Sequence, residues 1–303
     1  MKKMALPTIL LALVGAVFLV SCGGGTGLNP DPKVRTVPDV TSIKVERFVT
    51  DEQKKEEKSK PVYYSGKVTL TLTGTNLDQE LTVRFTKCVN LEEVADSATA
   101  LERVYTCTLR GVGYLPIEVL TTNELSRIWI SKIYIPLPQV AINTNQGSFT
   151  FELYPDSAPK TVDNFLQYVS EKFYTNTLFH RVIASVMIQG GGFDAELQAK
   201  ATHDPIKLER TGMSNLRGTI AMARTTDPDS ATSQFFINVA DNTALDTLNG
   251  GYAVFGTLIS SASTFQSVLD KLDAIAAVPT QTVGTHADVP VTPVIISDIT
   301  QKQ

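Results

Sequence analysis

The sequence predicts a mainly β protein in two parts: a small Ig-like β-sandwich over residues 40–138, and a larger part over residues 139–303 that combines strands with two helices. In the first part apolar residues alternate with polar ones, as over residues 68–73, which is typical of half-buried strands. In the second part, two stretches repeat apolar residues every three to four positions, which is typical of amphipathic helices.

The start of the chain predicts a cleavable export signal over residues 1–21. Two lysines precede an apolar run over residues 5–20, which ends just before Cys22. A transmembrane helix needs about 20 apolar residues. This run is shorter and holds Pro7 near its start, so a signal peptide fits better.

This pattern resembles a bacterial lipoprotein signal. The resemblance implies that Cys22 becomes the first residue and carries fatty acyl chains such as palmitate. Residues 22–39, rich in glycine and proline, would then form a flexible tether. Because Gly23 follows the cysteine, we expect a lipid-anchored protein of the bacterial cell envelope, on the periplasmic face of the outer membrane.

The strands expected between residues 40 and 138 lie at residues 68–73, 117–120 and 128–135. Residues 51–60 are highly charged but nearly balanced, which favours a solvated loop over a nucleic-acid patch. The net charge of −4 likewise predicts no attraction to nucleic acid or anionic lipid. Two roles remain open for this part, a spacer that lifts the second part away from the membrane and a specific recruitment domain.

Cys88 and Cys107 both lie in strand-like runs. In an oxidising periplasm, cysteines on neighbouring strands can form a disulfide, which is the pairing we expect. Two buried free thiols are the alternative. A metal site would need more ligands than the three histidines supply, so no metal is expected.

In the C-terminal part, Gln146 and Gly147 separate two alternating strands. Residues 155–170 predict a helix, since Ala158-Pro159 opens it and apolar residues recur on one face after it. Residues 265–275 predict a second amphipathic helix.

Five short motifs follow one another in this part. They are FHRVIASVMIQGGGF (179–193), GTIAMAR (218–224), SQFFIN (233–238), LD (245–246) and YAVFG (252–256). Their order and spacing resemble those of the cyclophilins, a family of peptidyl-prolyl cis/trans isomerases. The resemblance implies a closed β-barrel with two capping helices over residues 139–303. It also implies an isomerase that acts on proline-containing polypeptides, needs no cofactor and assists the folding of exported proteins.

The chemistry of this reaction explains why an arginine is the central residue. Rotation about the peptide bond must overcome a barrier of about 18–20 kcal/mol, and in the twisted state the proline nitrogen gains a lone pair. A fixed guanidinium can stabilise that state more than the planar one. Arg181 matches this catalytic position, and Gln189 matches the side chain that orients the substrate backbone.

The remaining positions that the resemblance assigns would bind substrate. They are Val186, Met187, Ala223, Arg224, Gln234, Phe236, Leu245 and Tyr252, with Ala223 and Arg224 acting through their main chain. By pattern alone Met187 and Phe236 would be ordinary core residues. His180 is interpreted as structural, and the glycines at 190–192 as a tight turn rather than a phosphate loop.

Two positions depart from the family pattern, which has an aromatic residue at each. They are Val186 and Ala244, and both changes shrink the apolar wall. We therefore expect weak binding of cyclosporin-type ligands. The alternative function that follows is a proline-peptide binding module or chaperone with weak or vestigial catalysis.

Overall fold

The computed structural model describes residues 37–49, 61–121 and 126–303. The predicted signal peptide, Cys22, nearly all of the tether and the charged residues 51–60 lie outside the described residues. Val37–Gln303 form one compact unit. The boundary expected at residue 138 stays a prediction.

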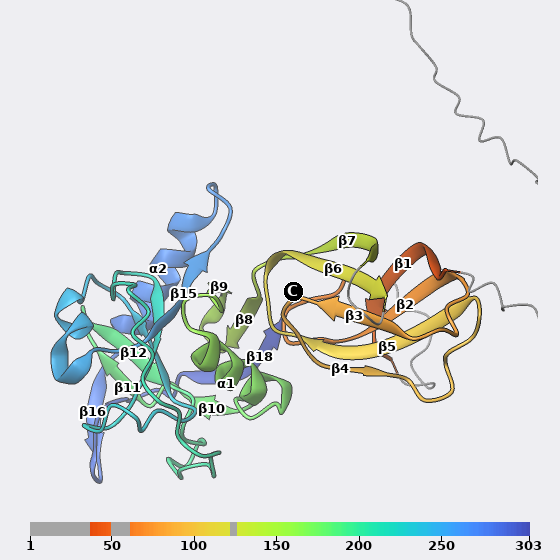
Figure 1. The fold of residues 1–303 in the computed structure, drawn as a ribbon. Helices are drawn as coiled ribbons and strands as arrows, with labels where there is room; N and C mark the ends of the chain where they lie inside the picture. The colour runs from red at the N-terminus through yellow and green to blue at the C-terminus, as the bar shows by residue number, and fades with distance from the viewer. Residues whose placement is uncertain (1–36, 50–60, 122–125) are drawn as a thin grey trace, which may run out of the picture. The chain divides into compact units, whose positions relative to one another are not determined.

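The N-terminal region is built from antiparallel strands in two sheets, drawn from red to yellow-green in Figure 1. One sheet has the order β1 (Asp39–Arg47), β2 (Lys67–Thr75), β5 (Glu102–Leu109), β4 (Cys88–Glu93); the other has the order β3 (Leu81–Phe85), β6 (Gly113–Thr121), β7 (Arg127–Ile135). Leu70 and Leu72 of β2 and Val119 of β6 are fully buried in one hydrophobic cluster. The two sheets therefore bury apolar faces as the alternation predicted, while the Ig-like topology stays a prediction.

A disulfide joins Cys88 of β4 to Cys107 of β5, with a Cα–Cα distance of 5.7 Å. The two strands pair antiparallel, and Cys88 lies opposite Leu109 in the ladder. The bond therefore links neighbouring strands of one sheet, and Cys107 is itself buried.

The C-terminal region is built on one nine-stranded sheet (Figure 1). Its order is β10 (Thr177–Leu178), β18 (Ile295–Gln301), β8 (Gln139–Thr144), β9 (Gly147–Leu153), β15 (Val254–Ile259), β13 (Thr219–Met222), β14 (Phe235–Asn238), β12 (Met187–Gly190), β11 (Arg181–Ile183). The paired strands form a half-barrel. Leu178 donates to the Phe193 carbonyl at 2.9 Å and accepts from the Gly191 N–H at 3.3 Å, which bridges β10 to the segment after β12. The closed barrel that the resemblance implied is therefore not complete. The ladder is open between β10 and β11, and these two bonds lie outside it.

Helix α1 (Pro159–Ser170) begins at Pro159, where Ala158-Pro159 was expected to open it, and residues 155–158 of the predicted range precede it. Proline is favoured in the first helical turn because that turn leaves its N–H groups without helical partners. The Glu209 carboxylate accepts two of these free N–H groups, from Lys160 at 3.0 Å and Thr161 at 2.8 Å. The helix buries Val162, Phe165, Leu166 and Val169, as its pattern predicted.

Helix α2 (Phe265–Ala276) buries its predicted apolar face unevenly, with Val268 and Leu269 half-buried against the main core. Leu272 and Ile275 are fully buried, whereas Phe265 is 39% exposed. A hairpin of β16 (Thr280–Val283) and β17 (His286–Pro290) follows the helix. This hairpin brings Asp288 to the site described below.

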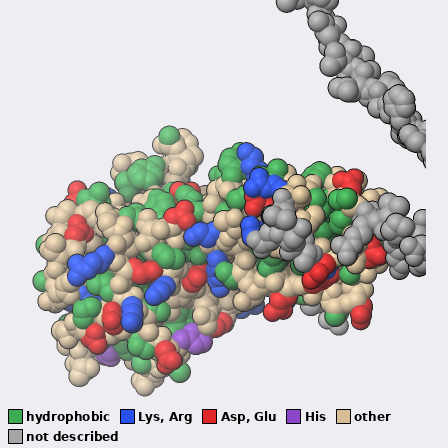
Figure 2. All heavy atoms as spheres, viewed as in Figure 1, with side chains coloured by type: hydrophobic (Ala, Val, Ile, Leu, Met, Phe, Trp, Pro, Cys, Tyr) green, Lys and Arg blue, Asp and Glu red, His purple; other side chains and the backbone are tan. Residues whose placement is uncertain are grey.

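On the face shown in Figure 2, acidic and basic side chains are interspersed and no large patch of one sign is visible. Over the described residues, no helix has both the length and the apolar character to span a membrane. The same residues hold no group of three or more His, Cys, Asp or Glu side chains arranged for a metal ion.

Candidate active site

The strand register brings the predicted site residues together. Arg181 of β11 lies directly opposite Gln189 of β12, and Gln189 lies opposite Phe236 of β14. Phe236 in turn lies opposite Ala221 of β13. Directly opposite residues project from the same face of a sheet, so these four side chains form one row across four strands.

The apolar members of this face form a small cluster separate from the main core. Its buried residues are Met187, Ala221, Ala223, Phe236 and Val254, and Ile183, Val186, Met213, Leu245 and Tyr252 pack around them. Val182 and Ile188 have the opposite parity along their strands and belong to the main core. Met187 and Phe236 are buried members of this cluster, at 8% and 4% exposed, and both also line a surface cavity.

This cavity has a volume of about 300 Å³. It is lined by Arg181, Ile183, Val186, Met187, Gln189, Ala223, Arg224, Phe236, Leu245 and Tyr252. Of the predicted substrate-site residues only Gln234 does not line it. Gln234 instead accepts a hydrogen bond from Gln189 Nε2 at 2.9 Å, and so orients that amide. Ile183 is an addition that the alternation of β11 could have indicated, because it shares a face with Arg181.

An acidic residue far along the chain contacts Arg181. Asp288 Oδ2 lies 3.5 Å from Arg181 Nε, and the two side chains are 40% and 43% exposed. No other partner of this guanidinium occurs within residues 37–49, 61–121 and 126–303. Both Nη groups are therefore left as donors on a side chain that lines the cavity.

The Arg224 side chain holds the loop that ends at Tyr252. Its guanidinium donates to the carbonyls of Leu248, Asn249 and Gly251 at 3.4, 2.9 and 2.7 Å. It also lies 4.4 Å from the centre of the Tyr252 ring, in cation–π contact. Gly251 has a φ of 95°, which side chains rarely tolerate. This loop conformation therefore depends on both the arginine and the glycine.

The main chain of Ala223 is only partly available to a peptide. Its N–H donates to the Gln234 carbonyl at 2.9 Å. Any main-chain hold that Ala223 has on a substrate must therefore come from its carbonyl oxygen.

A network of amides supports the Leu245 side of the cavity. Asp246, in the 3₁₀ turn η2 (Thr243–Asp246), accepts from the N–H and the side-chain amide of Asn215, both at 2.8 Å. The buried Asn238 donates to Asn215 and accepts from Asn242. Asn242 also donates to the Val186 carbonyl at 2.7 Å. The network therefore ties the turn that carries Leu245 to the turn that carries Val186.

His180 does not line the cavity. It is buried, and its ring meets Phe193 edge-on at 4.6 Å. Burial, with smaller effects from His286 and Arg181, lowers the pKa of His180 from 6.5 to about 4. The ring is therefore neutral at neutral pH, in keeping with a structural role.

The site thus combines an apolar cavity, a guanidinium and an oriented amide on a β half-barrel with two helices. Residues 139–301 match the family "Cyclophilin type peptidyl-prolyl cis-trans isomerase/CLD". The chain belongs to this family, and it is a cyclophilin-type peptidyl-prolyl cis-trans isomerase.

Three bacterial relatives illustrate the similarity. A peptidyl-prolyl cis-trans isomerase of Acinetobacter baylyi is 48% identical over 178 residues, which cover 58% of this chain and 91% of that protein. Peptidyl-prolyl cis-trans isomerase B of Escherichia coli is 48% identical over 53% of this chain and 98% of its own length. Peptidyl-prolyl cis-trans isomerase cyp18 of Streptomyces antibioticus is 50% identical over 52% of this chain and 94% of its own.

Proposed function

We propose that Arg181 catalyses isomerisation by donating a hydrogen bond to the proline nitrogen as the Xaa-Pro amide twists. In the planar amide that nitrogen has no free lone pair, because it is delocalised into the carbonyl. The donor therefore binds the twisted state better than the ground state, which is what lowers a barrier. The apolar wall of Met187, Phe236 and Leu245 would hold the proline ring and exclude water, which strengthens the guanidinium's field.

The observation that carries this proposal is the row of Arg181, Gln189 and Phe236 across three strands. A backbone ladder fixes their spacing before any substrate arrives. In this mechanism Gln189 orients the substrate backbone, and Asp288 is a positioning residue, since it engages Nε and leaves both Nη groups for the substrate.

A protease-coupled exchange assay on a short Ala-Pro peptide tests this function. We expect catalysed exchange that is saturable with peptide and lost in Arg181→Ala. Peptide binding without catalysed exchange would instead support the alternative of a binding module with vestigial catalysis, in which Val186 and the exposed Ala244 leave the wall too small.

The substrates we propose are exported polypeptides in the cell envelope. Support comes from the first part of the sequence, the basic and apolar signal pattern before Cys22. On this proposal Cys22 is acylated and the N-terminal sheets act as a spacer between the membrane and the isomerase. Uptake of labelled palmitate by the wild type, and its loss in Cys22→Ser, tests the anchor. An unlabelled wild-type protein would contradict it.

A further inference from the structure

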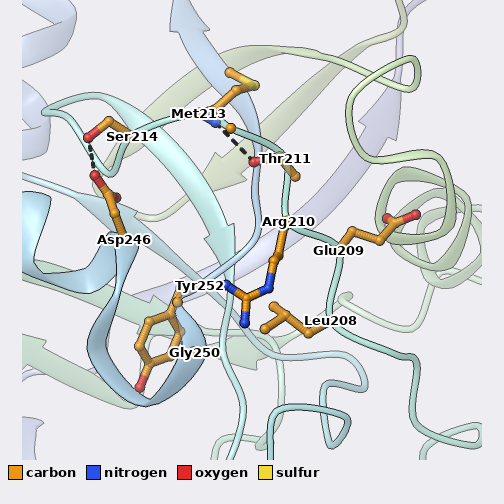
Figure 3. A pocket seen from close by; sticks show the side chains of 11 residues that line it. Leu208, Glu209, Arg210, Thr211, Met213, Ser214, Asp246, Gly250 and Tyr252 are labelled. Atoms are coloured by element: carbon orange, nitrogen blue, oxygen red, sulfur yellow. Dashed lines mark hydrogen bonds between the residues drawn. The ribbon is translucent and has the colours of Figure 1, made fainter.

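A second cavity lies next to the cavity lined by Arg181 and Met187, which we call the proline pocket, and the two share Tyr252. Its volume is about 230 Å³. It is lined by the loop of residues 208–214 on one side and by Asp246, Gly250, Gly251 and Tyr252 on the other (Figure 3). We call it the Arg210 pocket, because the Arg210 side chain extends across it in Figure 3.

Arg210 carries a charge that the surrounding residues do not neutralise. No hydrogen bond or ion pair of its guanidinium is found in the part of the chain that the structure describes. Its Nη2 would lie 4.0 Å from a Cβ built on Gly250, so the guanidinium lies close to the facing loop. The side chain is exposed and can bind an incoming anion.

The two acidic residues of the pocket have other partners. Glu209 accepts both N–H groups at the start of α1, from Lys160 and Thr161. Asp246 accepts from Ser214 and from Asn215. Burial acts to raise the pKa of Asp246, but these hydrogen bonds hold it below its ordinary value, so the carboxylate stays ionised and engaged.

The wall between the two cavities is rigid and adds positive charge. Arg224 fixes the loop through three carbonyls and stacks on Tyr252. Carbonyl oxygens satisfy its donors but leave its full charge uncompensated. A chain passing over Tyr252 from the proline pocket therefore meets two guanidinium groups, Arg224 and then Arg210.

We propose that the Arg210 pocket is a second substrate subsite, which takes an acidic side chain of the polypeptide whose proline occupies the first cavity. This inference rests on the proposed isomerase function and adds a preference for Asp or Glu close to the proline. The ion pair is solvent-exposed, and exposed pairs contribute modestly. We therefore expect a preference of about two- to fivefold.

The test uses pairs of short Ala-Pro peptides that differ only by Glu or Gln, placed in turn at each of three positions on either side of the Ala-Pro unit. Isomerisation is followed by NMR exchange, so that no protease adds its own sequence preference. At low salt we expect kcat/KM to favour Glu at one or two neighbouring positions, and the preference to shrink as salt screens the pair.

The variants R210Q, R210K and K271Q separate the possible outcomes. R210Q should lose the Glu preference and keep wild-type kcat/KM on the Gln peptides, whereas R210K should keep part of the preference. K271Q removes an exposed charge on α2 and should change nothing. Equal Glu/Gln ratios for wild type and R210Q would overturn the subsite while leaving the isomerase intact. Failure of the wild type on every neutral peptide would instead refute the proposed function itself.

Discussion

Replacing Arg181 by alanine should lower kcat/KM on an Ala-Pro peptide by about 10- to 150-fold. The variant removes one charged hydrogen bond that forms only in the twisted state, and such bonds contribute about 1.5–3 kcal/mol. Each 1.4 kcal/mol is about a factor of ten in rate. Folding should be little affected, because Arg181 is 43% exposed at the edge of the small cluster and outside the main core.

The companion substitution Asp288→Asn tests how the guanidinium is held. At 3.5 Å and about 40% exposure this pair adds little stability, but without the charge the arginine samples more orientations. We expect kcat to fall about two- to fivefold with KM unchanged, the range of one exposed ion pair. In the double variant Asp288→Asn should have no further effect, since its action depends on Arg181. A folded Arg181→Ala protein within twofold of wild-type kcat/KM would refute the mechanism, and additive losses would refute the role of Asp288.

Three further predictions follow from other residues. Ala244→Trp should tighten cyclosporin binding by about 1–3 kcal/mol, the scale for burying one large side chain, and isothermal titration that finds no gain would mean that position 244 is not part of the wall. Replacing Cys88 and Cys107 together by alanine should lower the unfolding free energy by about 2–4 kcal/mol without changing kcat/KM, whereas alkylation of both thiols in unreduced denatured protein would exclude the disulfide. Burial lowers the pKa of His180 in the folded state from its ordinary 6.5 to about 4. Between these pH values the unfolded state therefore binds more protons than the folded state. The stability that depends on this group is full above pH 6.5 and falls as the pH drops toward 4. Urea unfolding should show a loss of about 2–3 kcal/mol between pH 7 and 4.5 that is absent in His180→Gln, and equal losses in both proteins would contradict this.

The sequence predicted the features that depend on local periodicity. The alternation over residues 68–73 appears as β2, and the break expected at Gln146-Gly147 lies at the turn of Asn145 and Gln146, with Gly147 the first residue of β9. Both helices form as predicted, and α1 begins at Pro159, where Ala158-Pro159 was expected to open it. The sequence did not indicate that Glu209, distant along the chain, accepts the N–H groups of its first turn. The exposure of Phe265 at the start of α2 was not predicted, since amphipathic spacing indicates an apolar face but not which neighbour covers it.

The motifs predicted most of the residues that line the cavity, but they did not predict the contacts that each residue makes. Gln234, which the motifs assign to substrate binding, does not line the cavity and accepts a hydrogen bond from Gln189. Asp288 could not be predicted, because 107 residues separate it from Arg181 and only the β17 hairpin brings them together. Ion pairs between distant segments leave no periodic signal in a single sequence.

The two sides of the cavity that Arg181 lines are held by different contacts, and this bears on which side can vary. Arg181, Gln189 and Phe236 are placed by ladders between β11, β12 and β14, whose hydrogen bonds use main-chain atoms alone. Leu245 and Tyr252 lie on turns held by side chains, through the Asp246 network and the Arg224 clamp. A substitution on the second side can reshape the wall while the arginine keeps its register. Both departures from the family pattern, Val186 and Ala244, lie on turns outside the strand ladder. This is where a substitution can change the shape of the cavity without changing the strand register.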